Sequence, residues 1–202
     1  EDSLKRMIFK ASDKLSILAS GGEIMLESGL SGSELERLLD YVMVKYPAVI
    51  IDLSHAPQSL MYAVLSKANQ IVIVSSASVS ALRLSRSLIQ EIKNLRGEQQ
   101  NSIDLIVNMQ GAAAGSEIPQ KDIEKAMDFK PSGFISFNPA VFSQCESEGK
   151  KLLDHKEGQF IVKGTLMPIL KKTFNVDVDL STQSAGAKDS LLGGIMSKMK
   201  KK

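Results

Sequence analysis

Four short apolar runs alternate with amphipathic segments along this chain, and the alternation predicts its fold. The runs are Ala48 to Ile51, Gln70 to Ser75, Ser102 to Asn108 and Gly133 to Ser136. Runs of β-branched residues without polar alternation are typical of strands that are buried on both faces of a parallel sheet. Because helical segments separate the runs and the connections are short, we expect an α/β fold with a doubly wound, mostly parallel sheet.

Helices are predicted from apolar spacing and from start and stop signals. The clearest follows Ser33, which has capping-box spacing with Glu36, and it ends before Pro47. Asn138 and Pro139 form a strong helix start, because a capping residue precedes a proline at the first helical position. Pro168 is expected to bend the last long helix. The other expected elements are a helix in residues 1–12, a short strand from Leu15 to Ala19, and helices from Gln58 to Lys67, from Ser78 or Ser80 to Gly97, from Lys121 to Met127, from Asn138 to Gly149 and from Glu157 to Lys172.

Asp52 follows the first apolar run directly, and a short polar turn closed by Pro57 comes after it. In open α/β sheets, ligands bind outside the carboxyl ends of the strands, so this carboxylate stands where chemistry is usually found. The other interpretation is that Asp52 only caps the helix that follows. The local pattern leaves both interpretations open.

Composition narrows the class of protein. The chain has 202 residues, of which 43% are hydrophobic and 24% charged, as in ordinary globular domains. Its net charge of +2 argues against a dedicated nucleic-acid binder, which would carry a larger and clustered charge. Cys145 is the one cysteine, so an internal disulfide is impossible and a reducing cytoplasm fits best. No apolar run is long enough to span a membrane, and with two histidines and no Cys/His cluster a structural zinc site is not expected.

The last part of the chain differs in composition from the rest. Residues 176–188 are polar, small and aperiodic, which indicates a linker between a domain of residues 1–175 and a tail of residues 189–202. In the tail, apolar residues share one helical face beside a cluster of lysines, a pattern typical of helices that lie on anionic membranes. A frayed, solvated basic tail is the alternative, and Gly193 and Gly194 favour it by weakening a helix. The residues proposed for membrane contact are Leu191, Leu192, Ile195, Met196, Lys198 and Met199.

The order of strand ends resembles the second half of the MinD/ParA family, the deviant-Walker-A P-loop ATPases. The segment from Ala48 to Asp52 resembles the Walker B strand of that family. Ala68 to Ser75 resembles the segment that begins with an alanine-aspartate pair in family members. Phe137 to Pro139, continuing to Leu152, resembles the proline-led helix near the nucleotide base. Within the family the chain looks most like the CpaE/TadZ-type proteins of tight-adherence (Flp) pili.

The resemblance implies a three-layer P-loop NTPase fold and a role for each matched residue. Asp52 would hold Mg²⁺ through water and help to orient the hydrolytic water, in keeping with the preference of Mg²⁺ for oxygen ligands. Asn108 would bind the adenine of ATP, since an amide offers both donor and acceptor, although a turn or helix-cap role is equally open. Asn138 and Pro139 would shape the loop over the base. The resemblance also implies pilus or secretion machinery as partners, a nucleotide-dependent homodimer, and a cytoplasmic location, peripheral at the inner membrane if the tail binds there.

One part of the family pattern is missing from the sequence. There is no G-x-x-x-x-G-K-[ST] and no glycine-lysine-glycine-glycine variant, and the only Gly-Lys pair, Gly149-Lys150, follows a predicted helix. Without that loop, phosphates lack their nest of N–H groups and their main positive charge. We therefore expect this chain, as it stands, neither to bind ATP tightly nor to hydrolyse it. Since the chain starts at Glu1 rather than methionine, we expect the first strand and the P-loop to lie upstream.

Two other functions compete with the ATPase hypothesis. One is a localisation scaffold of the same fold that binds partners without turnover. The other is a response-regulator receiver, in which an apolar strand also ends in aspartate, here Asp52, and a later strand ends in Ser76-Ala77. A receiver also needs an upstream acidic pair and a lysine after its fifth strand, but Asp13 stands alone and no lysine follows Asn108 directly.

Overall fold

The computed structural model describes residues 6–19, 31–54, 56–97, 102–113 and 115–175. The chain divides into two compact units, one containing the described residues up to Ala63 and the other running from Val64 to Asn175. The boundary falls inside helix α3 (Gln58–Lys67), whose limits agree with the prediction. The predicted linker and the predicted tail lie outside the described residues.

In the first unit, Arg6 and Met7 are helical, and an antiparallel hairpin follows them directly. β1 (Ile8–Ser12) pairs with β2 (Leu15–Leu18), and Phe9 faces Ile17 in the register. The prediction of a helix over residues 1–12 was therefore wrong from Ile8 onward, because Asp13 and Lys14 turn the chain and pairing with β2 overrides the helical spacing of a few apolar residues. Lys10 Nζ donates to Asp13 Oδ1 at 2.9 Å across the turn.

Helix α2 (Gly32–Lys45) starts two residues earlier than predicted. Ser31 is the N-cap, and it forms a capping box with Glu34 in place of the expected Ser33 and Glu36. Both pairs have the same spacing, so the spacing alone does not choose between them. In the apolar stripe predicted for this helix, Leu39 and Val42 are buried, whereas Met43 is 52% exposed.

The run from Ala48 to Ile51 is extended but is not a strand in the structure. It pairs with no ladder among the described residues, and Ile50 is 86% exposed. The expectation of a strand buried on both faces is wrong for this segment as the structure describes it. Apolar, β-branched composition favours extended backbone, but a strand also requires a partner for its N–H and C=O groups.

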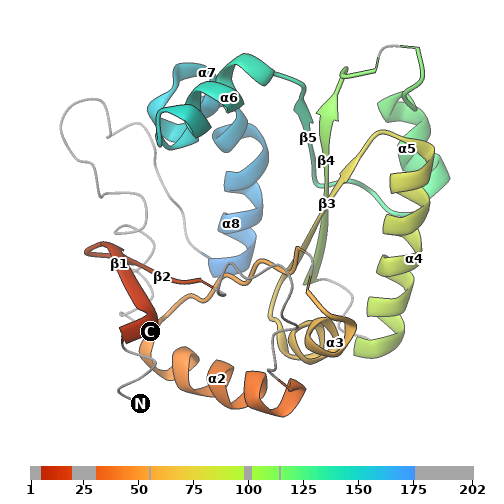
Figure 1. The fold of residues 1–202 in the computed structure, drawn as a ribbon. Helices are drawn as coiled ribbons and strands as arrows, with labels where there is room; N and C mark the ends of the chain where they lie inside the picture. The colour runs from red at the N-terminus through yellow and green to blue at the C-terminus, as the bar shows by residue number, and fades with distance from the viewer. Residues whose placement is uncertain (1–5, 20–30, 55, 98–101, 114, 176–202) are drawn as a thin grey trace. The chain divides into compact units, whose positions relative to one another are not determined.

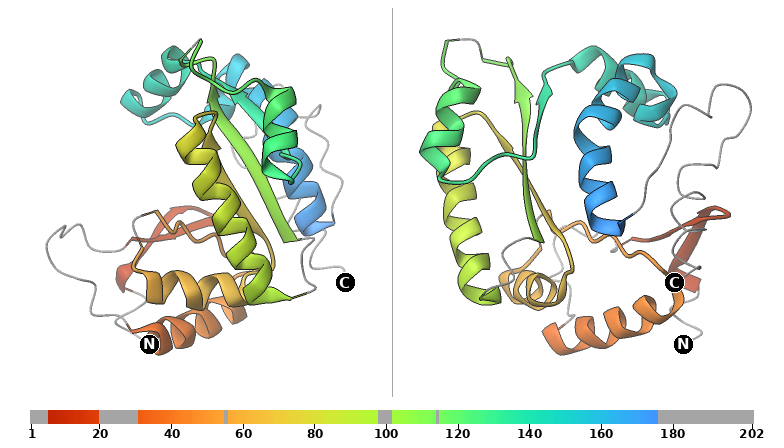
Figure 2. Two further views of the ribbon diagram at one scale, coloured as in Figure 1. Left: turned by 90° about the vertical axis from the view of Figure 1, so that its right-hand side faces the viewer. Right: turned by 180° about the vertical axis from the view of Figure 1, so that it is seen from behind.

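The second unit is built on a parallel sheet with the strand order β3-β4-β5. Its strands are β3 (Ile71–Ser76), β4 (Ile103–Gln110) and β5 (Gly133–Ser136), within two residues of the predicted limits. Helices α4 (Val79–Arg96) and α5 (Gln120–Met127) cover one face of the sheet, and α8 (Met167–Phe174) lies on the other (Figures 1 and 2). The second unit therefore has the three layers expected of a doubly wound fold.

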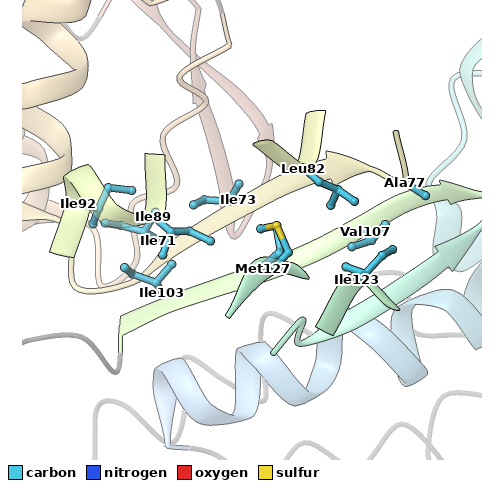
Figure 3. Close-up of a cluster of buried hydrophobic side chains, with 11 residues drawn as sticks. Ile71, Ile73, Ala77, Leu82, Ile89, Ile92, Ile103, Val107, Ile123 and Met127 are labelled. Atoms are coloured by element: carbon cyan, nitrogen blue, oxygen red, sulfur yellow. The ribbon is translucent and has the colours of Figure 1, made fainter. Parts of the chain in front are cut away.

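The core lies mainly between the sheet and α4 and α5, and alternate residues of β3 and β4 point into it. Figure 3 shows side chains of β3 and β4 meeting those of α4 and α5. A smaller cluster on the opposite face joins Ile106 and Ile135 to Ile169 of α8. The buried members of the main cluster are Ile71, Ile73, Ala77, Leu82, Ile89, Ile92, Ile103, Leu105, Val107, Ile123 and Met127.

The last part of this unit is helical, with one irregular turn. It contains α6 (Pro139–Ser147), α7 (Lys156–Ile161) and a π-helical turn (Val162–Leu166) that leads into α8. This wide turn interrupts the last long helix just before Pro168, which lacks the N–H that Gly164 O would accept in a regular α-helix. The expected bend at Pro168 stays a prediction. Cys145 is buried on α6, as expected of a small apolar side chain. None of the helices in the described parts is long and apolar enough to cross a membrane.

Candidate functional site

The carboxyl ends of the three parallel strands meet at one edge of the second unit. Ser76 of β3 is the register partner of Asn108 of β4, and Gln110 of β4 is the partner of Ser136 of β5. Asn138 follows Ser136 by two residues. The structure therefore brings Asn108 and Asn138 to the same sheet edge, the place where ligands of open α/β folds bind.

A local irregularity in β4 orients the side chain of Asn108. The register with β5 shifts between Val107 and Gln110, and Met109 has a φ of 57°. The Met109 N–H donates to Asn108 Oδ1 at 2.8 Å instead of continuing the ladder. Within the described part of the chain Asn108 Nδ2 makes no hydrogen bond, so it is a half-buried donor at the edge. Irregularities of this kind often redirect a side chain next to a functional site.

Asn138 uses both ends of its amide within the chain. Its Oδ1 accepts the Val141 N–H at 3.3 Å, which caps α6, and its Nδ2 donates to Glu157 Oε2 at 2.7 Å. Pro139 occupies the start of α6, as predicted. The predicted helix start is confirmed, whereas a role of Asn138 and Pro139 toward a base stays a prediction. Because both ends of the Asn138 amide are bonded within the chain, Asn138 and Pro139 would act on a ligand through the shape of the loop before α6, which Glu157 of α7 holds.

Serine hydroxyls line the end of β3 at the same edge. Ser85 Oγ of α4 donates to Ser75 Oγ at 2.9 Å, and Ser76 Oγ lies 3.2 Å from Ser78 Oγ. Ser78 in turn caps α4 by accepting the Ala81 N–H. The sequence predicted Ser78 or Ser80 as the cap, and the structure identifies Ser78. The buried bond between Ser75 and Ser85 was missed, because it joins residues ten positions apart on different elements.

A further polar centre, Glu117, was not predicted from the sequence. Its carboxylate accepts the N–H groups of Gly111 and Ala113, each at 2.7 Å, and the side chain of Gln110 at 3.2 Å. These bonds favour the ionised form, and the bonds from Ala113 and Gly111 lower the pKa of Glu117 most. The sequence signal that could have indicated this centre is a stretch of small residues with two glycines, Gly111 and Gly115, followed by a single carboxylate, Glu117.

A shallow hollow of about 580 Å³ lies between β5 and the segment from α7 to the π-helical turn. Asn138 is among its lining residues, but Asn108 is not. The hollow therefore lies on the α7 side of β5 rather than around both asparagines. Other residues that line it include Ser136, Glu157, Phe160, Gly164 and Thr165.

Asp52 belongs to the first unit and is described by its local contacts. Its Oδ1 accepts the Ser54 N–H at 2.9 Å and the Ser54 hydroxyl at 2.6 Å, which is an Asx-turn. The side chain is exposed. This geometry fits the interpretation of Asp52 as a turn residue, and its role toward Mg²⁺ stays a prediction. No group of three or more His, Cys, Asp or Glu side chains that could hold a metal ion occurs within the described ranges.

Comparison with solved structures bears on the fold. Neither a family model nor a curated protein matches the chain. Among solved structures it is similar to a ParA family ATPase from Chlorobium tepidum TLS, with a TM-score of 0.67 and 20% sequence identity. The match covers 84% of this chain and 69% of the other. The chain therefore has the fold of a ParA-like P-loop NTPase, as the order of its strand ends predicted.

Proposed function

We propose that this chain is part of a MinD/ParA-like ATPase and contributes the side of the site that recognises the nucleotide base. The observation that carries the proposal is Asn108, whose Nδ2 is an unused donor at the carboxyl edge of a sheet with a ParA-like fold. An amide with a free donor and a remaining acceptor lone pair suits the edge of adenine. The ParA-like fold is the reason to propose an adenine nucleotide as the ligand, and Asn108 is the residue proposed to contact its base.

The residues fit the two ends of ATP unequally. The base end has Asn108 and the loop that Asn138 and Pro139 begin. For the phosphate end, the 202 residues contain no glycine-rich loop with a lysine. We propose that this loop is supplied by sequence outside the chain and that Asp52 holds Mg²⁺ through water beside it. Bound ATP and Mg²⁺ would supply the phosphoryl group and the charge that hydrolysis requires, and the chain's own residues would bind and orient them.

The finer assignment to a CpaE/TadZ-type protein of pilus assembly, or of polar localisation of secretion machinery, is also a proposal. It is supported by the sequence resemblance from Ala48 to Asp52 and from Phe137 to Leu152. This assignment implies pilus or secretion proteins as partners, a homodimer, and the inner-membrane surface as the site of action.

A localisation scaffold of the same fold is the second candidate. The missing phosphate-binding loop favours it, because without that loop the chain has no preformed place for the charge of three phosphates. The two candidates differ in whether ATP is bound and turned over by the complete polypeptide that the gene encodes.

Calorimetric titration of that polypeptide with ATP and Mg²⁺ tests the proposal. The comparison uses Asn108→Ala and the control Asn94→Ala, which removes an exposed amide from the last turns of α4. We expect Asn108→Ala to weaken ATP binding about tenfold, as for a lost hydrogen bond to a partly buried polar group, and the control to have no effect. Absence of ATP binding in the unaltered polypeptide would favour the scaffold.

A further inference from the structure

The loop that follows β4 closes around a carboxylate of its own. It is made mostly of glycine and alanine, and its residues are largely exposed. Its fixed points are the bonds that Glu117 accepts from Gly111, Ala113 and Gln110. Backbone bonds close two turns of the loop, from Ala112 N–H to Met109 O and from Ser116 N–H to Ala113 O, and the Ile118 N–H donates to Ala77 O. The Glu117 bonds join these turns to one side chain, and the small residues of the loop offer few other side chains to pack.

The backbone of the loop is shaped to receive an anion. Gly111 has a φ of 93°, and the N–H groups of Gly111 and Ala113 both point to the Glu117 carboxylate. Such nests bind anions through backbone dipoles, and here the bound anion is Glu117. Gly111 suits its position because a left-handed φ strains other residues.

The same loop is joined to both sides of the sheet edge. The Met109 N–H fixes Asn108 Oδ1, and the Gln110 carbonyl accepts the Phe137 N–H at 2.8 Å, directly before Asn138. Glu117 holds Gln110 and Gly111, the two residues after Met109. Release of the carboxylate would therefore free the backbone that orients Asn108 and the start of the β5 loop.

We propose that Glu117 is a positioning residue, which holds the loop after β4 as an internal anionic ligand and so sets the direction of Asn108 toward a purine base. The inference rests on the proposed function, because it assigns Glu117 a role at that base site. Glu117 itself touches no base, and its effect passes through Gly111, Gln110 and Met109. Ile118 packs against the main core cluster, but Gly111, Ala112 and Ala113, the residues that Glu117 holds, are exposed. Loss of the Glu117 bonds should therefore change the site more than the stability of the fold.

The test uses the chain itself and the nucleoside adenosine, which needs no phosphate-binding loop. In Glu117→Ala, hydrogen exchange of the Gly111 and Ala113 amides should accelerate about tenfold or more, because each loses a hydrogen bond to a charged carboxylate. The amides of β4 should stay protected. Millimolar acetate should slow that exchange again by refilling the nest. The matched control is Glu124→Ala, an exposed glutamate on α5.

The second readout is the NMR response of Asn108, Gln110 and Phe137 to adenosine. We expect a response in the unaltered chain and in Glu124→Ala, a weaker one in Glu117→Gln, and loss of it in Glu117→Ala. Unchanged exchange at Gly111 and Ala113 in Glu117→Ala overturns the inference. Accelerated exchange with an unchanged adenosine response also overturns it, because Glu117 would then only stiffen the loop. No adenosine response in the unaltered chain overturns the proposed function itself, and with it the role of Glu117 toward a base.

Discussion

Ser76 at the end of β3 and Asn108 near the end of β4 are partners in a parallel register, so their side chains leave the same face of the sheet at the same edge. The strand on the other side, β5, adds Ser136 opposite Gln110. Three strands with polar residues at their ends therefore lie together at this edge. The proposed base site depends on this relationship.

A buried carboxylate at the opposite end of the sheet fixes α8, and its removal should destabilise the second unit. Asp104 is 4% exposed and accepts bonds from Gln70 and Ser132, while Lys172 Nζ lies 3.3 Å from both of its oxygens. We expect Asp104→Ala to cost about 2–3 kcal/mol, below the range for a fully buried pair, because half of the Lys172 side chain is exposed.

Amide exchange of β4, or urea unfolding followed by a probe in residues 64–175, measures this cost. Lys172→Met should cost less than Asp104→Ala, because Gln70 and Ser132 still donate to the carboxylate. Lys121→Met on α5, an exposed lysine, serves as the control. Equal stability of Asp104→Ala and the control would show that the network does not hold α8.

Position 133 needs a glycine because Thr165 packs closely against it, and not because of the backbone conformation of Gly133. A Cβ at this position would lie 2.6 Å from Thr165 Cγ2, whose hydroxyl donates to Phe134 O. Gly133→Ala should therefore destabilise the second unit by about 1–3 kcal/mol through overpacking. Thr165→Ser removes the obstructing methyl but keeps the hydroxyl, so the double variant should recover most of the loss in a thermal or urea unfolding experiment.

Gly164 provides the matched control for that experiment. A Cβ there meets nothing within 4 Å, and alanine suits a helical position better than glycine. Gly164→Ala should leave stability unchanged or raise it by up to about 1 kcal/mol. If Gly133→Ala were as harmless as Gly164→Ala, the close packing of the π-helical turn on β5 would be refuted.

Loop closure by Glu117 should depend on pH. Its pKa is lowered in the folded chain, so the carboxylate contributes to loop order above its usual pKa of about 4.3 and loses that contribution as pH falls through the lowered value. Amide signals of Gly111 and Ala113, followed by NMR from neutral to acid pH, should shift together below about pH 4.3. Signals that move at neutral pH would point to a different titrating group.

The predicted tail remains a prediction, and deletion of residues 189–202 tests it. Apolar residues on one face and several lysines should add affinity for anionic lipid, by about 1 kcal/mol for each lysine near the surface. We expect the shortened protein to bind anionic liposomes more weakly, and salt to reduce the difference. Equal liposome binding by the two proteins would end the membrane hypothesis.

Local signals in the sequence predicted most of the second unit. Asn138 and Pro139 located the start of α6, Gly133 to Ser136 matched β5, and the serine before α4 was recognised as a cap. Each of these depends on a few neighbouring residues, so the sequence contains the information directly. The Asn108 position followed from the same logic, since a polar residue that ends an apolar run marks a strand end.

What the sequence did not predict depends on partners that are distant in the chain. The hairpin at Ile8 forms because β2 is available to pair, whereas the run at Ala48 pairs with no strand among the described residues although its composition favours a strand. In the sequence, Asp104 is a single polar residue in an apolar run. Its partners Ser132, Gln70 and Lys172 lie 28, 34 and 68 residues away. Such contacts have no local pattern, and for this reason the polar network and the Glu117 loop were missed.

The central proposal is that Asp52 and Asn108 each contribute to ATP hydrolysis, and turnover of ATP by the complete polypeptide tests it most directly. We predict that Asp52→Ala abolishes turnover while the circular dichroism spectrum and the melting temperature remain those of the unaltered protein, and that Asn108→Ala raises KM for ATP. Unchanged turnover in Asp52→Ala, with the fold intact, would contradict the account.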